Sequence, residues 1–248
     1  MGYEESRIEG RNAVLEAFRS GKTIDKLYVL DGCQDGPVKS ITREARKHDT
    51  IINYVAKERL DQLSETGKHQ GVIAVSAAYE YAEVEDILAA AEEKGEAPFI
   101  IILDGIEDPH NLGAIIRTAN QAGAHGVIIP KRRAVGLTPT VARTSAGAIN
   151  YTPVAKVTNI SNTMKELKDK GMWFVCADMA GTRMYDLDLT GPIGLVIGNE
   201  GDGVSPLVKK NCDMVASIPM KGDIDSLNAS VATGVLAYEI VRQRINKG

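Results

Sequence analysis

Apolar and polar positions in the first third of the chain follow the pattern of a small α/β module. Helical spacing of apolar residues predicts helices over 12–20 and 37–48. Short apolar runs bounded by turn residues predict strands over 26–30, 51–55 and 71–77. A module of roughly eighty residues is small but can fold alone.

An acidic, alanine-rich segment separates this module from the rest of the chain. Residues 82–97 carry one basic and six acidic side chains. Val84, Ile87, Leu88 and Ala91 within it fall at helical spacing, so we expect a partly helical linker. The expected organisation is therefore a first domain over 1–81, an acidic linker over 82–97 and a second domain over 98–248.

The second domain opens with an apolar run over 99–103, as expected of a strand buried on both faces. A helix is predicted over 112–122, with Asn111 as its N-cap and Gly123 just past its end. Such alternation of strands and helices predicts an α/β domain with a largely parallel sheet. The other predicted elements are strands over 126–129, 172–177, 195–197 and 214–218 and a last helix over 228–244.

Composition excludes several classes of protein. Hydrophobic residues make up 44% of the chain and charged residues 25%, and no apolar run is long enough to cross a membrane. The polar N-terminus does not resemble a secretory signal, so we expect a cytoplasmic protein with no membrane partner. Cys33, Cys176 and Cys212 lie far apart and the four histidines are scattered, so no metal site is expected.

The net charge of −4 at first argues against a nucleic-acid partner. The acidic excess lies mostly in residues 82–97, which alone contribute −5. A local basic patch on either side of that segment could therefore still contact phosphates.

Three polar clusters that contain glycine or small residues each follow a predicted strand of the second domain, over 104–119, 195–203 and 218–232. Open α/β sheets bind their ligands at the carboxyl ends of the strands. Taken singly, each cluster could also be a capped helix or a tight turn. The chain has no complete P-loop and no GxGxxG after a strand, which argues against ATP hydrolysis and against dinucleotide binding.

Together and in this order, the clusters resemble the signature of the SpoU/TrmH-type RNA 2′-O-ribose methyltransferases of the SPOUT superfamily, over residues 98–244. One departure is Ala229, where the family more often has valine, a change that affects packing rather than chemistry. The residues that carry the resemblance are Asn111, Gly113, Arg117, Gly198, Asn199, Glu200, Gly201, Ile218, Pro219, Met220, Ser226, Leu227, Asn228, Ser230, Val231 and Ala232.

The resemblance implies a trefoil-knotted domain with a parallel sheet that holds S-adenosylmethionine in a bent conformation. It also implies a homodimer whose active site forms at the subunit interface. Implied catalytic residues are Arg117, Asn111, Glu200 and Asn228. Implied cofactor-binding residues are Gly198, Asn199, Gly201, Ile218, Met220, Leu227 and Asn228.

The first domain resembles the ribosomal-protein-like RNA-binding module of the ribosomal-RNA branch of this family. Residues 8–17 and 69–72 carry this weaker likeness; they could also be a helix start and a turn, but beside the catalytic signature we favour RNA binding. The basic loop 131–133 could be a solvated face, yet in an RNA enzyme we favour contact with RNA. The expected RNA-binding residues are Arg11, Asn12, Gln70, Arg132 and Arg143.

The implied reaction is methyl transfer to the ribose 2′-hydroxyl of a nucleotide, a guanosine, in 23S ribosomal RNA. The alternatives are the same reaction on transfer RNA and a non-catalytic RNA-binding protein of the same fold. A guanidinium stays protonated in proteins, so we expect Arg117 to clamp a phosphate and stabilise the developing alkoxide. The proton would leave through a phosphate oxygen or water, while Asn111 orients the ribose and Asn228, with Glu200, orders the cofactor loops.

Overall fold

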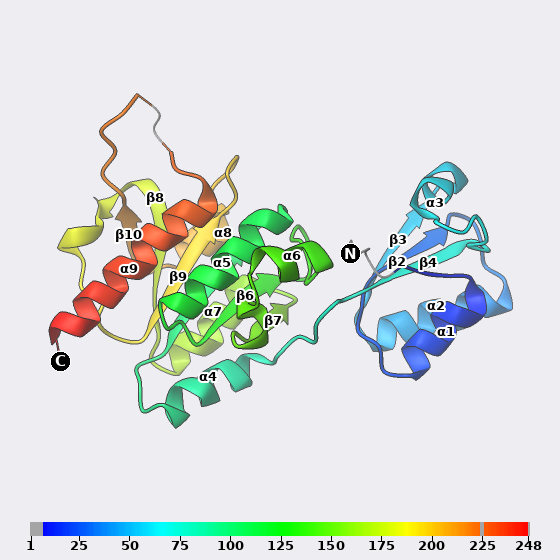
Figure 1. Ribbon diagram of the computed structural model, residues 1–248, viewed down its shortest axis with the longest axis horizontal. Coiled ribbons are helices and arrows are strands. Elements are labelled where there is room, and N and C mark those ends of the chain that lie inside the picture. The colour runs from blue at the N-terminus through cyan, green and yellow to red at the C-terminus, as the bar shows by residue number, and fades with distance from the viewer. Residues whose placement is uncertain (1–6, 224–225, 248) are drawn as a thin grey trace. The chain divides into compact units, whose positions relative to one another are not determined.

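The computed structural model describes residues 7–223 and 226–247, which divide into two units (Figure 1). Unit 1 ends at Glu80 and also includes Gly136–Pro139; unit 2 comprises Tyr81–Val135 and the chain from Thr140 onwards. No helix in the described ranges is long and apolar enough to cross a membrane.

Unit 1 is a four-stranded sheet with three helices. The strand order is β1-β4-β2-β3, with β2 parallel to β3 and antiparallel to β4. Leu27 and Val29 of the central strand pack with Val14 and Ile41 of two helices in a wholly buried core. The elements are β1 (Arg7–Glu9), α1 (Arg11–Arg19), β2 (Ile24–Leu30), α2 (Gly36–Lys47), β3 (Ile51–Val55), α3 (Lys57–Leu63) and β4 (Val72–Ser76).

The predicted strands and helices of this region are all present, but β1 and α3 were not predicted. Both are too short to show a period, and β1 is held by a long-range contact. The Glu9 carboxylate accepts hydrogen bonds from the hydroxyls of Ser64 and Thr66 and from two backbone N–H groups beside them. Although burial raises the pKa of Glu9, these hydrogen bonds lower it to about 2.

Unit 2 contains a six-stranded sheet in which every neighbouring pair is parallel, in the order β10-β8-β9-β5-β6-β7. The parallel sheet is thus as predicted. The strands are β5 (Phe99–Asp104), β6 (Gly126–Pro130), β7 (Val154–Val157), β8 (Trp173–Arg183), β9 (Ile193–Gly198) and β10 (Met214–Ser217).

Helices cover both faces of this sheet. On one face α4, α7 and α8 pack on the sheet residues Ile100, Ile128 and Phe174, and α5 and α9 lie side by side over the other face (Figure 1). The helices are α4 (Val84–Glu93), α5 (Pro109–Gln121), α6 (Pro139–Thr144), α7 (Ile160–Asp169), α8 (Pro206–Lys210) and α9 (Ala229–Lys247), with 3-10 turns η1 (Ala148–Asn150) and η2 (Met184–Asp186).

The acidic segment 82–97, expected as a linker, is instead packed into unit 2. Its helix α4 buries Ile87 and Ala91 completely, and Ile87 belongs to the same core as Ile100. A Cβ at Gly126 would lie 2.6 Å from the Ile87 side chain, so this glycine makes room for the helix. The acidic side chains occupy the outer face of a docked amphipathic helix.

The strand order creates a switch point between β5 and β9. From β5 the chain continues outward through β6 and β7, and it returns on the other side through β8, β9 and β10. Asp104 and Gly198, the last residues of β5 and β9, are register partners. Because ligands bind where the strand order reverses, this edge of the sheet is the expected site.

Candidate active site

The loops that follow β5 and β9 are tied together at the switch point. The buried carboxylate of Asp104 accepts a hydrogen bond from the backbone N–H of Ser205 at 2.8 Å. Gly105 has a φ of +90°, and a Cβ there would lie 3.2 Å from the amide nitrogen of Asn199. The first and second clusters of the sequence therefore meet in space.

The second cluster is a loop that closes on itself. A Cβ at Gly198 would lie 2.0 Å from the backbone of Gly203, so only glycine permits this closure. The side-chain oxygen of Asn199 accepts hydrogen bonds from the N–H groups of Gly201 and Asp202, at 2.9 and 2.7 Å. Asn199, expected to bind the cofactor, thus uses its carbonyl oxygen to hold the loop.

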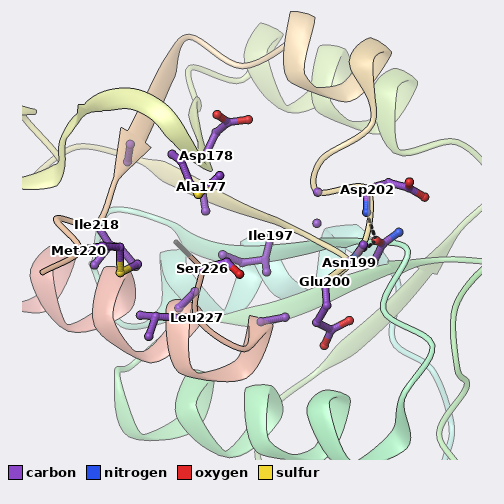
Figure 2. Close-up of a pocket in the computed structure, with 17 residues that line it drawn as sticks. Ala177, Asp178, Ile197, Asn199, Glu200, Asp202, Ile218, Met220, Ser226 and Leu227 are labelled. Carbon is purple, nitrogen blue, oxygen red and sulfur yellow. Dashed lines mark hydrogen bonds between the residues drawn. The ribbon is translucent and has the colours of Figure 1, made fainter. Parts of the chain in front are cut away.

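A cavity of about 430 Å³ lies beside the middle of β8, the carboxyl ends of β9 and β10 and the start of α9 (Figure 2). Such a volume is within the usual range for small-molecule sites, roughly 300–1,000 Å³. The cavity contains all the expected cofactor residues except Asn228, which does not line it. Its lining residues include Ala177, Asp178, Ile197, Gly198, Asn199, Glu200, Gly201, Ala216, Ile218, Met220, Ser226, Leu227, Ala229 and Ala232.

Three lining residues from the middle of β8, just past the part paired with β9, were not predicted from the sequence: Ala177, Asp178 and Met179. The Asp178 carboxylate pairs with Lys209 of α8 at 2.6 Å, and this hydrogen bond lowers the pKa of Asp178. In Figure 2 the Asp178 carboxylate points away from Ile197 and Leu227. The pair connects the middle of β8 to α8, the helix that follows the Gly198–Gly203 loop.

A chain of side-chain hydrogen bonds joins all three clusters. The nearly buried amide of Asn111 donates to the carboxylate of Glu200. The Asn111 carbonyl oxygen accepts from the Asn228 amide at 3.1 Å, and the Asn228 oxygen accepts from the Ser230 N–H at 2.9 Å. One asparagine amide can do this because it is both donor and acceptor. Three of the four expected catalytic residues are thereby in contact.

Asn111 is not the N-cap of its helix, contrary to the expectation. Asp108 caps α5 by accepting a hydrogen bond from the N–H of His110 at 2.9 Å, and Pro109 is the first helical residue. Aspartate followed by proline is itself a strong start signal. The helix therefore begins three residues earlier than expected, and Asn111 lies in its first turn.

Arg117 lies on a different side of α5 from Asn111. A separation of six residues rotates a side chain by about 120° around a helix, so the two side chains leave α5 in different directions. Arg117 is exposed, and its guanidinium makes no hydrogen bond or ion pair with any residue that the structure describes. The chain alone does not bring Arg117 to Glu200 or Asn228.

Helix α6 approaches the start of α5 closely because residue 113 is glycine. A Cβ at Gly113 would lie 1.8 Å from Thr144 Oγ1, whose hydroxyl is 3.3 Å from the carbonyl oxygen of Pro109. The exposed Arg143 precedes Thr144 in this helix. The exposed Arg132 belongs to a loop that the N–H of Val135 fixes to the carbonyl of Ile106 at 3.0 Å.

Of the three RNA-binding residues expected in unit 1, two bond to other residues of the unit and one is exposed. Arg11 pairs with Asp35 at 2.6 Å and donates to the carbonyl of Gln70 at 3.1 Å. The Gln70 side chain in turn accepts from the Arg11 backbone N–H at 3.2 Å. Arg11 and Gln70 thus fasten the start of α1 to the turn before β4, whereas Asn12 is exposed.

Among the described residues, no group of three or more His, Cys, Asp and Glu side chains could hold a metal ion. The polar groups at the switch point are instead an amide and carboxylate network beside a largely apolar cavity. Such a site can order a small molecule and a hydroxyl-bearing substrate next to each other.

Two family profiles match almost the whole chain. Residues 98–238 match the SpoU rRNA methylase family, and residues 7–82 match the RNA 2′-O ribose methyltransferase substrate-binding family. The TrmH family tRNA/rRNA methyltransferase YacO of Bacillus subtilis is 49% identical over 245 residues, which is 98% of each chain.

Two solved structures are similar in fold and sequence. The SpoU methyltransferase AviRb from Streptomyces viridochromogenes, in complex with AdoMet, has a TM-score of 0.62 and 28% identity over 97% of this chain and 90% of its own. The TrmH/SpoU tRNA modifying enzyme of A. aeolicus has a TM-score of 0.56 and 32% identity over 62% of this chain and 78% of its own. With the fold, the switch-point site and both profiles in agreement, the chain belongs to the SpoU/TrmH family of RNA methyltransferases.

Proposed function

We propose that the chain transfers the methyl group of S-adenosylmethionine to the ribose 2′-hydroxyl of a guanosine in 23S ribosomal RNA. The observation that carries this proposal is the cavity of about 430 Å³, whose lining residue Glu200 belongs to the Glu200–Asn111–Asn228 hydrogen-bond chain. S-adenosylmethionine supplies a methyl group already activated by a positively charged sulfur, so the residues mainly have to position two reactants.

The lining of the cavity fits this cofactor. Ile218, Met220 and Leu227 provide apolar walls for a purine, and the backbone around Gly198 can approach a ribose closely. Glu200 lies at the opposite end of the same cavity from Ile218 and Met220 (Figure 2), and Asn111 donates a hydrogen bond to its carboxylate. We propose that this end is where methyl transfer occurs. The bent cofactor conformation and the trefoil knot are further predictions, which a crystal structure with the cofactor would check.

The RNA would approach the exposed side of α5. Arg117 is free of intramolecular partners within the described chain, so its planar guanidinium is available to clamp a phosphate and to stabilise a developing alkoxide. Arg132 and Arg143 lie on segments fastened to the start of α5 and to the loop before it, and they would bind neighbouring phosphates. Asn111 would orient the ribose through the network that it centres.

Ribosomal RNA is favoured over transfer RNA by the extent of the matches. The solved tRNA modifying enzyme matches 62% of this chain, whereas a substrate-binding profile matches residues 7–82 in addition to the methylase profile. Because unit 1 corresponds to the substrate-binding profile that adds to the methylase profile, we propose that it binds ribosomal RNA and that the exposed Asn12 contacts this RNA.

A homodimer is part of the proposal. Val231, Tyr238 and Ile245 are exposed by 50%, 50% and 72% and follow one another at seven-residue intervals on α9. They therefore form an apolar stripe on one face of that helix. A second copy of the chain would cover it, and a solution mass near the monomer value of 26.7 kDa at micromolar concentration would contradict the dimer.

The decisive experiment incubates the protein with methyl-labelled S-adenosylmethionine and either ribosomal or transfer RNA. The expected result is label in 23S ribosomal RNA at a dinucleotide that resists alkaline hydrolysis, because the 2′-hydroxyl needed for cleavage is blocked. Label only in transfer RNA would overturn the substrate. RNA binding without cofactor binding in calorimetry would instead identify a non-catalytic RNA-binding protein.

A further inference from the structure

We infer that His110 accepts the proton of the ribose 2′-hydroxyl during methyl transfer, in place of the phosphate oxygen or water expected from the sequence. The inference rests on the proposed function and adds a residue to it. It follows from three points: the His110 side chain has no bonding partner in the described chain, it shares a face of α5 with Arg117, and the reaction needs a proton acceptor.

Three of the four histidines have structural tasks. The buried His69 contacts Asp61 at 3.0 Å and accepts from the N–H of Gly71, and His48 stacks on the ring of Phe18. The buried His125 accepts the N–H of Phe99 through Nδ1 at 3.0 Å and contacts a carboxylate through Nε2. Each of these imidazoles is therefore accounted for by the fold.

His110 is the exception. Its ring is exposed and makes no hydrogen bond, ion pair or aromatic contact with any other residue in 7–223 and 226–247. Its backbone N–H is capped by Asp108, so the start of the helix does not need the side chain. The residue with the unengaged imidazole therefore directly precedes Asn111, the centre of the network that includes the cavity residue Glu200.

His110 shares a face of α5 with Arg117. Seven residues separate them, and seven residues return a helix to within about 20° of the same direction. The rise between them is about 10.5 Å, and helical side chains lean toward the N-terminus, so a long arginine extends back toward the histidine. The residue proposed to clamp the RNA and the free imidazole thus point to the same side.

The reaction requires a proton acceptor that the other groups do not provide. The guanidinium of Arg117 has hydrogen-bond donors and no acceptor, and the Glu200 carboxylate is held by Asn111, which lies on a different side of α5 from Arg117 and His110. Imidazole is the side chain that ordinarily exchanges protons near neutral pH. As the methyl carbon leaves sulfur and bonds to the ribose oxygen, the hydroxyl proton passes to an imidazole nitrogen of His110. The products are S-adenosylhomocysteine, the 2′-O-methyl ribose and an imidazolium. The imidazolium then releases its proton to water.

Single-turnover methyl transfer to ribosomal RNA tests this role in four proteins: the wild type, His110→Ala, His110→Gln and the control Gln121→Ala. Gln121 is exposed and lies eleven residues from His110 on the same face of α5. Cofactor affinity is measured by calorimetry and folding by thermal unfolding, both of which should match the wild type in every variant. Label transfer by the wild-type protein tests the proposed function separately, before any variant is compared.

We expect both His110 variants to lose about 10²–10⁴-fold in the rate of methyl transfer at saturating RNA, the usual contribution of a general base. Added imidazole should raise the rate of His110→Ala and leave the wild type and Gln121→Ala unchanged. A glutamine variant with the wild-type rate, a loss confined to RNA affinity, or an alanine variant that imidazole does not restore would each overturn the inference. Each of these results would leave the proposed function standing.

Discussion

Replacement of Asn111 by alanine removes the centre of the hydrogen-bond chain that joins the three loops. The lost bonds are one to the carboxylate of Glu200 and one from the amide of Asn228 at 3.1 Å. A bond to a charged group contributes about 1.5–3 kcal/mol and a neutral bond about 1 kcal/mol. Because Glu200 and Asn228 are exposed and can be rehydrated, we expect a loss of about 2 kcal/mol in the free energy of unfolding.

A double-mutant cycle isolates the pair. Asn228→Ala should cost about 1–2 kcal/mol, because it removes both the bond to Asn111 and the cap that accepts the N–H of Ser230. The double variant should be more stable than the sum of the two losses predicts, with a coupling of about 1 kcal/mol. Asn159 is a matched control, since it caps α7 and does not contact Asn111 in the described chain.

Urea unfolding followed by the fluorescence of Trp173 measures these differences, because this single tryptophan lies on β8 of unit 2. Calorimetry with S-adenosylmethionine should show a weaker affinity for Asn111→Ala, since the loops that line the cavity lose their connection. The hydrogen-bond chain would be refuted if the unfolding free energies lost in Asn111→Ala and Asn228→Ala added within about 0.3 kcal/mol in the double variant, as they should for the control pair Asn111→Ala and Asn159→Ala.

Substitutions at three further positions test other parts of the molecule. Gly113→Val should destabilise unit 2 by at least about 1–3 kcal/mol, measured by urea unfolding, because a Cβ would lie 1.8 Å from Thr144 Oγ1; unchanged stability would contradict the close packing of α6. Glu9→Gln should destabilise unit 1 at neutral pH by up to about 2 kcal/mol, which is less than the pKa shift alone would give because solvent screens this partly exposed carboxylate. Since the folded-state pKa of Glu9 is lowered to about 2, the difference from wild type should disappear as the pH falls from about 4.5 toward 2, and a difference independent of pH would contradict this. Arg117→Ala should leave the free energies of unfolding and of cofactor binding within about 0.5 kcal/mol of wild type, while the rate of methyl transfer falls by about 10²–10³-fold. Arg117→Lys should keep a small rate of methyl transfer whose pH profile parallels that of wild type. A new inflection at a lysine-like pKa would show that residue 117 acts as the base.

Local sequence pattern predicted the elements because burial and period were unambiguous. The run over 99–103 lies in β5, which is wholly buried on both faces, and the strand predicted over 51–55 has the bounds of β3. The docking of α4 was not predictable in this way. Its apolar spacing is the same for a linker helix and for one packed on a sheet, and only the space left by Gly126 in the fold distinguishes them.

The arrangement of the candidate site could be predicted only in part, for a similar reason. The resemblance pointed to Asn111, Glu200 and Asn228 as expected catalytic residues, but 89 and 117 residues separate Asn111 from its two partners, so no local pattern could show that they bond to one another. Asp178 was missed because it lies inside a strand, just past the part paired with β9, and belongs to no motif. Its place in the lining of the cavity follows from the position of β8 beside β9 in the sheet.

The two sides of helix α5 carry residues with different expected roles. Its inward side presents Asn111, which is nearly buried and connects the loops around the cavity, so changes there affect stability and cofactor affinity together. Its outward side presents His110 and Arg117, which the described chain leaves without partners, so changes there should affect methyl transfer with little effect on stability. Because both sides belong to one rigid helix, ordering the cofactor loops also fixes where the outward residues stand, and the RNA meets groups already in position.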